Sequence, residues 1–133
     1  MLLTTTATSS IGEGMTDTTN PKDIAGATKP QLHLIPPAAS LYEAQVMALG
    51  ATKYGAYNWR EKKVRITVYI SAAMRHLAQL LDGEDIDPES NQPHAAHVRS
   101  CMGIILDAMA TGNLVDDRPT QGAASRLIGE MSK

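Results

Sequence analysis

Apolar residues recur at intervals of three and four in two stretches of the second half of the chain, and this spacing predicts two helices. The first runs from Val64 to Leu81, and Gly83 ends it. The second starts at Pro93 and ends near Ala110, with Gly112 as its left-handed cap. The apolar positions are Ile70, Ala73, Met74, Leu77, Leu80 and Leu81 in the first stretch, and Val98, Cys101, Met102, Ile105, Leu106 and Met109 in the second.

A third helix is predicted earlier in the chain, because Pro36-Pro37 suits a helix start, where proline is tolerated. It runs from about residue 37 to Leu49, with an extension to Lys53, and stops before Gly55. The next segment, KYGAYNWREKK, is predicted to be a loop with aromatic and basic side chains. Upstream, NPKDIAGATKPQLHLIPP contains four prolines, so it is predicted to be a structured arm or loop and not a helix.

These elements predict an all-α fold: a helical bundle of three to four main helices with an irregular N-terminal arm. The absence of Phe and the 7 Met residues also favour helix over sheet. Three helices of about four turns form a thin bundle, and such a bundle often completes its core by self-association. A homo-oligomer is therefore expected.

The two ends of the chain differ in composition from the part between them. Residues 1–19 are dominated by Thr, Ser and Gly and are predicted to be disordered. Met15 offers an alternative translation start within that segment. Residues 20–118 are predicted to form the folded domain. Residues 119–133 form a polar tail with a short amphipathic segment around Leu127 and Ile128.

Composition narrows the function classes. The formal net charge is −2 and there is no run of Lys or Arg, so bulk charge does not attract nucleic acid. One cysteine excludes an internal disulfide framework and fits a reducing compartment. The N-terminus lacks the pattern of a signal peptide, and no apolar run reaches the roughly 18 to 20 residues of a membrane span. A cytoplasmic protein with no membrane partner is expected.

The stretch from Arg75 to His97 concentrates the candidate chemistry. His94 and His97 are three residues apart at a predicted helix start, so both rings project to one side and could share a metal. The helix N-terminus also favours a nearby anion. The alternative is a chance pair of histidines in a polar first turn.

Four carboxylates stand within six residues just before these histidines. Such a cluster is costly unless water solvates it or a cation neutralises it. Oxygen ligands suit Mg²⁺ or Mn²⁺, whereas imidazole shifts the preference towards Mn²⁺ and later metals. A solvated acidic loop remains the alternative. The carboxylates are those of Glu84, Asp85, Asp87 and Glu89.

Three further residues allow a structural or a functional interpretation. Arg75 lies on a polar stripe with Ser71, which favours a surface salt bridge. His76 has apolar neighbours at four-residue spacing and is predicted to be partly buried, for packing or for function. Glu43 shares a helix face with Val46, so its carboxylate needs a partner unless it lies at the surface; a metal or a donor on a base edge would serve.

A group of polar and aromatic residues could hold a nucleotide. Trp59 could stack on a base, and several Lys and Asn side chains could contact phosphates. The familiar phosphate-binding loops, Walker A and GxGxxG, are absent. The polar-aromatic group comprises Lys53, Tyr54, Asn58, Trp59 and Arg60, and the further phosphate candidates are Asn20, Lys22 and Lys29.

Several motifs, taken in order, resemble the dATP/dGTP diphosphohydrolases of phages, which belong to the MazG-like, all-α NTP pyrophosphatase superfamily. They are NPKD, KPQLHLIPP, GATKYGAYNWR, RHL, GEDIDPES and HAAH, and they extend from Asn20 to Asp117. The resemblance implies a MazG-like helical core that assembles into a homodimer or homotetramer. It also implies hydrolysis of a purine dNTP, dGTP or dATP or both, to dNMP and pyrophosphate in an infected bacterial host.

That activity would remodel the phage nucleotide pool, for example by supplying dGMP for modified-base DNA. Water would be the nucleophile, and two or more Mg²⁺ or Mn²⁺ ions would bridge the phosphates. The superfamily holds its metals with EExxE on one helix and ExxD on the next. Here the matched positions carry Ala72, Ala73 and His76, and then His94 and His97. Either other acids supply the ligands, or the histidines bind phosphate.

The resemblance and the residues together give a set of expected roles. Glu43, Glu84, Asp87, His94 and His97 hold metal, and all of these except His97 are expected to be catalytic. The nucleotide is held by Asn20, Lys22, Lys53, Tyr54, Asn58, Trp59, Arg75 and His76. Two alternatives remain: a non-catalytic sensor of metal or nucleotide on the same bundle, and a plain interaction module.

Overall fold

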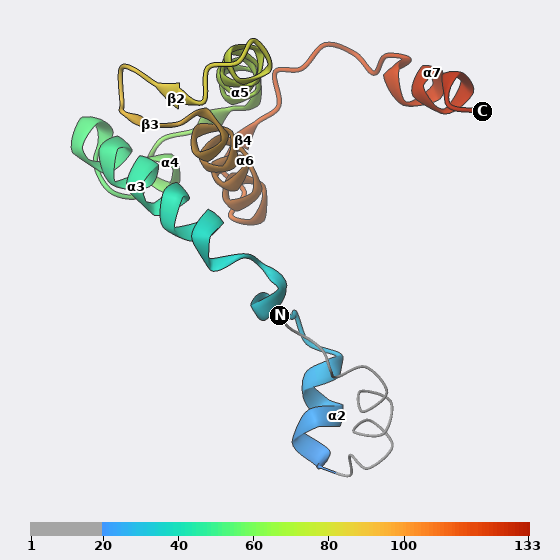
Figure 1. The fold of residues 1–133 in the computed structure, drawn as a ribbon. Coiled ribbons are helices and arrows are strands. Elements are labelled where there is room, and N and C mark those ends of the chain that lie inside the picture. The colour runs from blue at the N-terminus through green and yellow to red at the C-terminus, as the bar shows by residue number, and fades with distance from the viewer. Residues whose placement is uncertain (1–19) are drawn as a thin grey trace. The chain divides into compact units, whose positions relative to one another are not determined.

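The structure is a computed structural model that describes residues 20–133 of the chain. The predicted disorder of residues 1–19 and the alternative start at Met15 lie outside the described residues. The chain divides into two compact units, with the boundary after Pro36 (Figure 1). Each unit is described by itself.

The first unit contains a short helix that the sequence did not predict. Helix α2 spans Pro21–Ala27, and the 3₁₀ helix η1 spans Leu32–Leu34. The side chain of Asn20 caps α2 by accepting a hydrogen bond of 2.9 Å from the Lys22 backbone N–H. The expectation of an arm without helix was wrong because Pro21 occupies the first turn, where no backbone donor is needed, and Pro30 follows after the helix has ended.

The second unit contains three main helices, as predicted. They are α3 (Pro37–Tyr54), α5 (Ile66–Leu81) and α6 (His94–Ala110). Helix α6 packs against both α5 and α3 (Figure 1). Two shorter helices are α4 (Asn58–Glu61) and α7 (Ala124–Met131). The predicted all-α fold class is confirmed, and no helix among residues 20–133 has the length and hydropathy needed to span a bilayer.

Two pairs of short strands modify the predicted helix boundaries. Strands β1 (Val64–Arg65) and β4 (Leu114–Val115) pair in parallel, so α5 begins at residue 66 and not at Val64. Strands β2 (Ile86–Asp87) and β3 (Gln92–Pro93) form an antiparallel hairpin between α5 and α6. Pro93 is therefore the N-cap of α6 and not its first helical residue.

The glycines predicted to end two helices do so, but the short helix α4 was not predicted. Gly83 (φ +99°) follows α5 and Gly112 (φ +71°) follows α6, both in the left-handed region that favours glycine. The segment predicted as a loop, residues 53–63, instead contains α4. That one-turn helix starts after Tyr57, which adopts a left-handed backbone conformation with φ 57°. A single turn has no periodic pattern from which to predict it.

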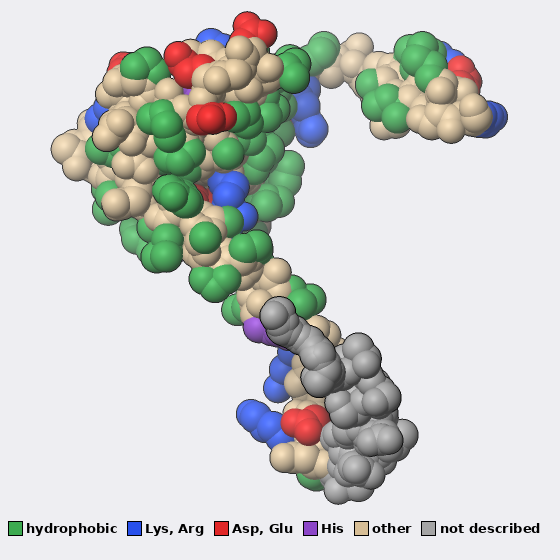
Figure 2. Space-filling view, viewed as in Figure 1, with side chains coloured by type: hydrophobic (Ala, Val, Ile, Leu, Met, Phe, Trp, Pro, Cys, Tyr) green, Lys and Arg blue, Asp and Glu red, His purple; other side chains and the backbone are tan. Residues whose placement is uncertain are grey.

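The apolar core of the second unit is small. Several large apolar side chains stay exposed, including Leu81 on α5 at 88% and Leu106 on α6 at 66%. The space-filling view shows apolar side chains open on the surface among charged ones (Figure 2). The buried apolar residues are Val46, Val64, Ile66, Ala73, Ala96, Ile105 and Ala108.

Asn113 joins the α4 segment to the end of α6, and its isosteric replacement by Asp is expected to destabilise the second unit. The Nδ2 amide donates to the backbone carbonyls of Trp59 and Lys62. In Asn113→Asp both carbonyls lose their donor and face a carboxylate, so we expect the free energy of unfolding to fall by roughly 1–3 kcal/mol in urea titrations. Asn91→Gly is the control, because Asn91 is exposed and has a φ of 59° that glycine adopts freely. An unchanged midpoint for Asn113→Asp would contradict the prediction.

Candidate functional site

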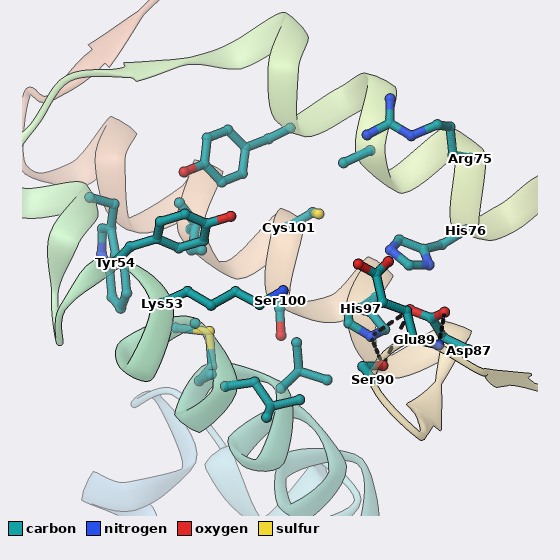
Figure 3. Close-up of a pocket in the computed structure, with 18 of the residues that line it drawn as sticks. Lys53, Tyr54, Arg75, His76, Asp87, Glu89, Ser90, His97, Ser100 and Cys101 are labelled. Atoms are coloured by element: carbon teal, nitrogen blue, oxygen red, sulfur yellow. Dashed lines mark hydrogen bonds and ion pairs between the residues drawn. The ribbon is translucent and has the colours of Figure 1, made fainter.

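A cavity of about 820 Å³ lies in the second unit, between α3, α4, α5, α6 and the β2–β3 hairpin (Figure 3). Its walls are apolar and aromatic in one part and polar in another. Basic side chains from two helices, α3 and α5, also line it. The polar and aromatic lining residues are Lys53, Tyr54, Asn58, Trp59, Tyr69, Arg75, His76, Gln79, Asp87, Glu89, Ser90, His97, Ser100 and Cys101.

The indole ring of Trp59 is held in place by a hydrogen bond to Asp107. Its Nε1 donates to Asp107 Oδ2 at 2.7 Å, and Arg60 binds the same carboxylate through two nitrogens at 2.9 Å each. Tyr57 lies beside the indole with 5.4 Å between ring centroids. Because its only polar atom is occupied by Asp107, the indole can offer an apolar face to the cavity. Such a face suits stacking against a flat ring.

Two cations enter the cavity lining from different helices. Lys53 extends from the end of α3, and Arg75 belongs to α5 (Figure 3). Arg75 Nη1 donates to Ser71 Oγ at 3.1 Å, and within residues 20–133 it has no carboxylate partner at ion-pair distance. The surface salt bridge considered for Arg75 is therefore not formed. Both cations remain able to bind an anion.

The hairpin presents Asp87 as an ionised carboxylate. Its side chain is buried and accepts hydrogen bonds from the Glu89 backbone N–H at 3.0 Å and the Ser90 hydroxyl at 3.2 Å. Burial by itself raises the pKa of Asp87. These hydrogen bonds and the neighbouring histidines outweigh burial, so the pKa lies below its usual value.

His97 and His76 stack on each other beside that carboxylate. Their ring centroids lie 4.3 Å apart with planes 5° from parallel. His97 Nε2 lies 2.7 Å from Ser90 Oγ and 3.4 Å from Asp87 Oδ2. Burial is the main cause that lowers the pKa of both histidines. His97 and His94 further lower the pKa of His76, and His94 further lowers that of His97. The stacked rings are therefore neutral near pH 7.

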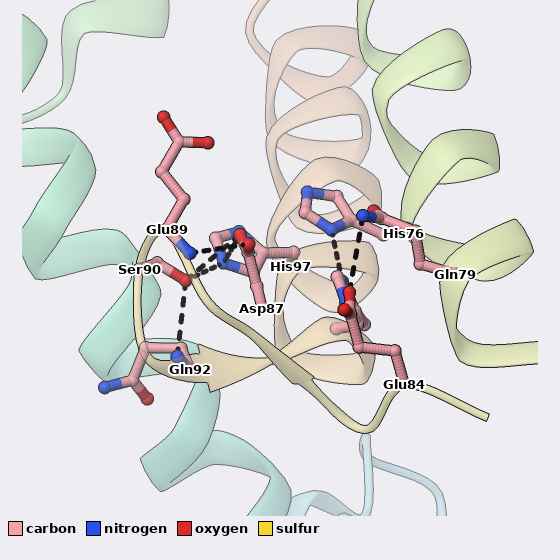
Figure 4. Close-up of polar contacts among 9 residues, drawn as sticks. His76, Gln79, Glu84, Asp87, Glu89, Ser90, Gln92 and His97 are labelled. Carbon is pink, nitrogen blue, oxygen red and sulfur yellow. Dashed lines mark hydrogen bonds and ion pairs between the residues drawn. The ribbon is translucent and has the colours of Figure 1, made fainter.

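A chain of three residues runs from the surface to this cluster: Glu84, His94 and His76. Figure 4 labels its two ends, Glu84 and His76. Glu84 Oε1 lies 2.7 Å from His94 Nε2, and His94 Nδ1 lies 2.8 Å from His76 Nδ1. His94 is 0% exposed, so both its nitrogens need partners inside the protein. A carboxylate only accepts hydrogen bonds, so His94 Nε2–H donates to Glu84. The direction of the bond between His94 Nδ1 and His76 Nδ1 is set by which of the two nitrogens carries the hydrogen.

The same cluster contains a group that could hold a metal ion. One ligand atom from each of His76, Asp87 and His94 lies within 4.8 Å of the other two. Two imidazole nitrogens and a carboxylate oxygen form a donor set that suits a divalent transition metal. His76 was expected to bind nucleotide, and here it belongs to the candidate metal group.

The structure brings together most of the site residues predicted from the sequence. Eight of them line the cavity. Glu84 and His94 do not line it, but they contact each other in the three-residue chain that ends at His76. Glu43 does not line the cavity; its Oε1 binds Arg99 Nε at 3.0 Å. Asn20 and Lys22 belong to the first unit. The eight lining residues are Lys53, Tyr54, Asn58, Trp59, Arg75, His76, Asp87 and His97.

Several lining residues were not predicted from the sequence. Ser90 lies in the β2–β3 hairpin. The strands of this hairpin have two residues each, which is too short for a pattern of apolar and polar positions to predict them. Ser100 and Cys101 follow His97 by three and four residues, so their place on the same helix face was available from spacing alone. Ser100 Oγ is buried without a hydrogen-bond partner in the described residues. Burial raises the pKa of the Cys101 thiol, which keeps it neutral.

The lowered pKa values of His76 and His97 predict that acid destabilises the second unit. An unfolded histidine protonates near pH 6.5, and the folded rings protonate at lower pH. Between those values the unfolded chain binds more protons, so the free energy of unfolding must fall as pH drops below about 6.5. Urea titrations from pH 7.5 to 5.5 with a chelator present measure this. The double variant His76→Gln, His97→Gln should lose that part of the slope, and stability that rises on acidification would contradict the prediction.

Comparisons with known proteins agree with the resemblance seen in the sequence. The family described as dATP/dGTP diphosphohydrolase, N-terminal, matches residues 19–118. A protein of Salmonella phage PMBT28 named dATP/dGTP diphosphohydrolase is 34% identical over 90 residues, which cover 68% of this chain and 30% of that protein. The chain thus spans less than a third of that relative's length. No solved structure matches significantly. The chain belongs to the dATP/dGTP diphosphohydrolase N-terminal family.

Proposed function

We propose that the protein hydrolyses a purine deoxynucleoside triphosphate, dGTP or dATP or both, to dNMP and pyrophosphate with the help of divalent cations. The observation that carries the proposal is one cavity that combines an aromatic wall, a buried carboxylate beside neutral histidines, and two cations that have no ion-pair partner within residues 20–133. These features match the base, the phosphates and the reacting centre of a nucleotide. The phage relative's name supports the same activity.

The nucleotide is proposed to lie along the cavity with its base at the aromatic wall. Trp59 and Tyr54 offer flat surfaces there, and Asn58 offers an amide that can hydrogen-bond a base edge. The phosphates then extend towards Lys53 and Arg75, whose charges offset part of the triphosphate charge.

The reacting phosphate is proposed to face Asp87 and His97. Divalent cations such as Mg²⁺ or Mn²⁺ supply charge neutralisation and lower the pKa of bound water. The residues fit this need because Asp87 is ionised and the rings of His76 and His97 are neutral. Asp87 and the hydroxyl of Ser90 orient the attacking water for in-line displacement of pyrophosphate. Glu84 keeps His94 in place behind them.

A product assay tests the proposed activity. The full chain is incubated with each dNTP and with Mg²⁺ or Mn²⁺, and the products are resolved by ion-exchange chromatography. We expect dGTP or dATP to yield the matching dNMP and pyrophosphate in equal amounts, with no turnover in excess chelator. Release of orthophosphate, or equal turnover of dCTP and dTTP, would contradict the proposal.

A second candidate is a sensor that binds nucleotide and metal without turnover. It is favoured by the Ala72, Ala73 and His76 positions, where the superfamily's metal-binding helix has three acids. Isothermal titration calorimetry with a non-hydrolysable dGTP analogue separates the two. Tight metal-dependent binding together with no product from dGTP would establish the sensor. Turnover would exclude it.

We also propose that the protein is a homodimer or homotetramer. The exposed apolar side chains of α5 and α6, among them Met74, Leu77 and Leu106, support self-association because a solvated monomer leaves them unburied. Multi-angle light scattering measures the mass against 14.2 kDa for one chain. A monomer at micromolar concentration would contradict the proposal. The proposed setting is the cytoplasm of an infected bacterium, where the enzyme would adjust the dNTP pool.

A further inference from the structure

We propose that His76, His94 and Asp87 bind one divalent transition-metal ion through two imidazole nitrogens and one carboxylate oxygen, and that this site prefers Mn²⁺ or a later ion to Mg²⁺. Two imidazole nitrogens of these residues face each other. His76 Nδ1 and His94 Nδ1 are 2.8 Å apart, and an Asp87 oxygen completes a group within 4.8 Å. The three residues come from α5, α6 and the β2–β3 hairpin.

The spacing of the two nitrogens fits a shared ion. Two imidazole nitrogens that each lie about 2.1 Å from one metal are roughly 3.0–3.4 Å from each other. The rings therefore need to separate by only a few tenths of an ångström. A hydrogen bond between two imidazoles also explains 2.8 Å, so proton and metal are alternative occupants of the same position.

Glu84 sets His94 in the state that a metal requires. Its carboxylate accepts the Nε2–H of His94 at 2.7 Å, and in the neutral tautomer with that hydrogen the lone pair is on Nδ1. Metal-bound histidines commonly have such a carboxylate on their second nitrogen. In that tautomer His94 binds an ion without rearrangement, and His76 binds through Nδ1 once its hydrogen is on Nε2.

The donor types determine the preferred ion. Mg²⁺ favours oxygen ligands and retains its water, whereas imidazole nitrogen stabilises Mn²⁺ and increasingly the later first-row metals. Two of the three proposed ligands are imidazoles, and Asp87 is the only directly bound charge. Because His76 and Asp87 also line the cavity, the remaining coordination positions open onto it. Their use by a phosphate rests on the proposed function, but the ligand set does not.

Spectroscopy on bound Mn²⁺ tests the ligand set directly. The full chain is stripped with a chelator, dialysed and titrated with Mn²⁺, and free Mn²⁺ is followed by electron paramagnetic resonance. We expect one tightly held Mn²⁺ per chain that a tenfold excess of Mg²⁺ does not displace. Electron spin-echo modulation should show ¹⁴N coupling. In protein labelled with ¹⁵N only at histidine, that coupling should change to the ¹⁵N pattern, which needs no variant.

Three variants extend the test. His76→Gln should weaken Mn²⁺ binding at least tenfold and reduce the nitrogen coupling. Glu84→Gln should weaken binding about 10- to 100-fold while the coupling remains, because Glu84 acts through His94. His33→Gln is the control, since His33 belongs to the first unit and should bind Mn²⁺ as the parent chain does. Circular dichroism confirms that each variant is folded.

The outcomes separate this inference from the proposed activity. Bound Mn²⁺ without nitrogen coupling, or displacement by an equal concentration of Mg²⁺, would overturn the ligand set. If such a protein still hydrolysed dGTP with Mg²⁺, the proposed function would stand without it. Nitrogen-coupled Mn²⁺ with no turnover of any dNTP would support the ligand set and contradict the proposed function.

Discussion

Asp87→Asn is expected to lower kcat for dNTP hydrolysis by roughly 10²- to 10³-fold, a size typical of removing one charge-stabilising group from an active site. Asparagine has nearly the same shape, and its carbonyl oxygen can still accept the hydrogen bond from the Glu89 backbone N–H that Asp87 Oδ1 accepts. The hairpin should therefore keep its form. What disappears is the buried negative charge beside His97 and His76.

Asp85→Asn is the matched control for this variant. Asp85 lies two residues earlier in the same linker, is exposed, and is not among the lining residues of the cavity. Its backbone carbonyl, which the variant retains, accepts from the His94 N–H. We expect kcat within about threefold of the parent chain. Steady-state kinetics on both variants decides the matter, and similar losses in the two would indicate a general effect of acidic charge and not a role for Asp87.

Helices α5 and α6 were predictable because their apolar residues repeat at helical spacing over four turns, whereas α3 was predicted from the helix start at Pro36-Pro37. The predicted stretch Val64–Leu81 and the observed α5 differ by two residues, since a β pair takes up Val64 and Arg65. Four prolines predict no helix for the segment that contains α2, but Pro21 stands in a first turn, where proline interrupts nothing. Proline interrupts a helix only where a backbone donor is required, so its position matters more than its number.

The histidines show the limit of spacing as a guide. Spacing alone suggested that His94 and His97 share a metal because both project to one side of a helix. In the structure they serve different partners: His94 binds Glu84 and His76, whereas His97 binds Ser90 beside Asp87. The partner choice depends on the register between α5 and α6, which no local pattern encodes.

Glu43 illustrates a related limit. Its place on an apolar helix face correctly indicated that the carboxylate needs a partner. That partner is Arg99 on α6, at 3.0 Å. The ideal Cβ of an alanine at position 103 would lie 2.8 Å from Glu43 Oε2, so the absence of a side chain at Gly103 gives this carboxylate its room. A long-range ion pair of this kind requires the tertiary arrangement of two helices.

Lys53→Gln is expected to raise KM for the dNTP by about 10- to 100-fold and to change kcat much less. One charge-assisted hydrogen bond to a phosphate is worth roughly 1.5–3 kcal/mol, which corresponds to that range in affinity. The ammonium lines the cavity from α3. Burial is the main cause of the lowered pKa of His97, and the positive charge of Lys53 lowers it further. The charge of Lys53 therefore reaches the polar part of the cavity.

Lys63→Gln is the control for a bulk-charge effect. Lys63 is exposed and is not among the residues that line the cavity, so its removal changes the net charge equally while leaving the site intact. Its KM should stay within about twofold of the parent value at 0.15 M salt, where exposed charges are screened beyond about 8 Å. Equal KM changes in the two variants would show that Lys53 acts through net charge alone.

The double variant Lys53→Gln, Arg75→Gln examines whether the two cations hold one ligand. They come from different helices, α3 and α5, and no described residue forms an ion pair with either. If both bind the same triphosphate chain, loss of the first lets the phosphates move, and the second loss then costs less than it does alone. The combined change in ln KM should therefore be smaller than the sum of the single changes. Full additivity would indicate that Lys53 and Arg75 contact independent parts of the substrate, and the proposed phosphate path between α3 and α5 would have to be abandoned.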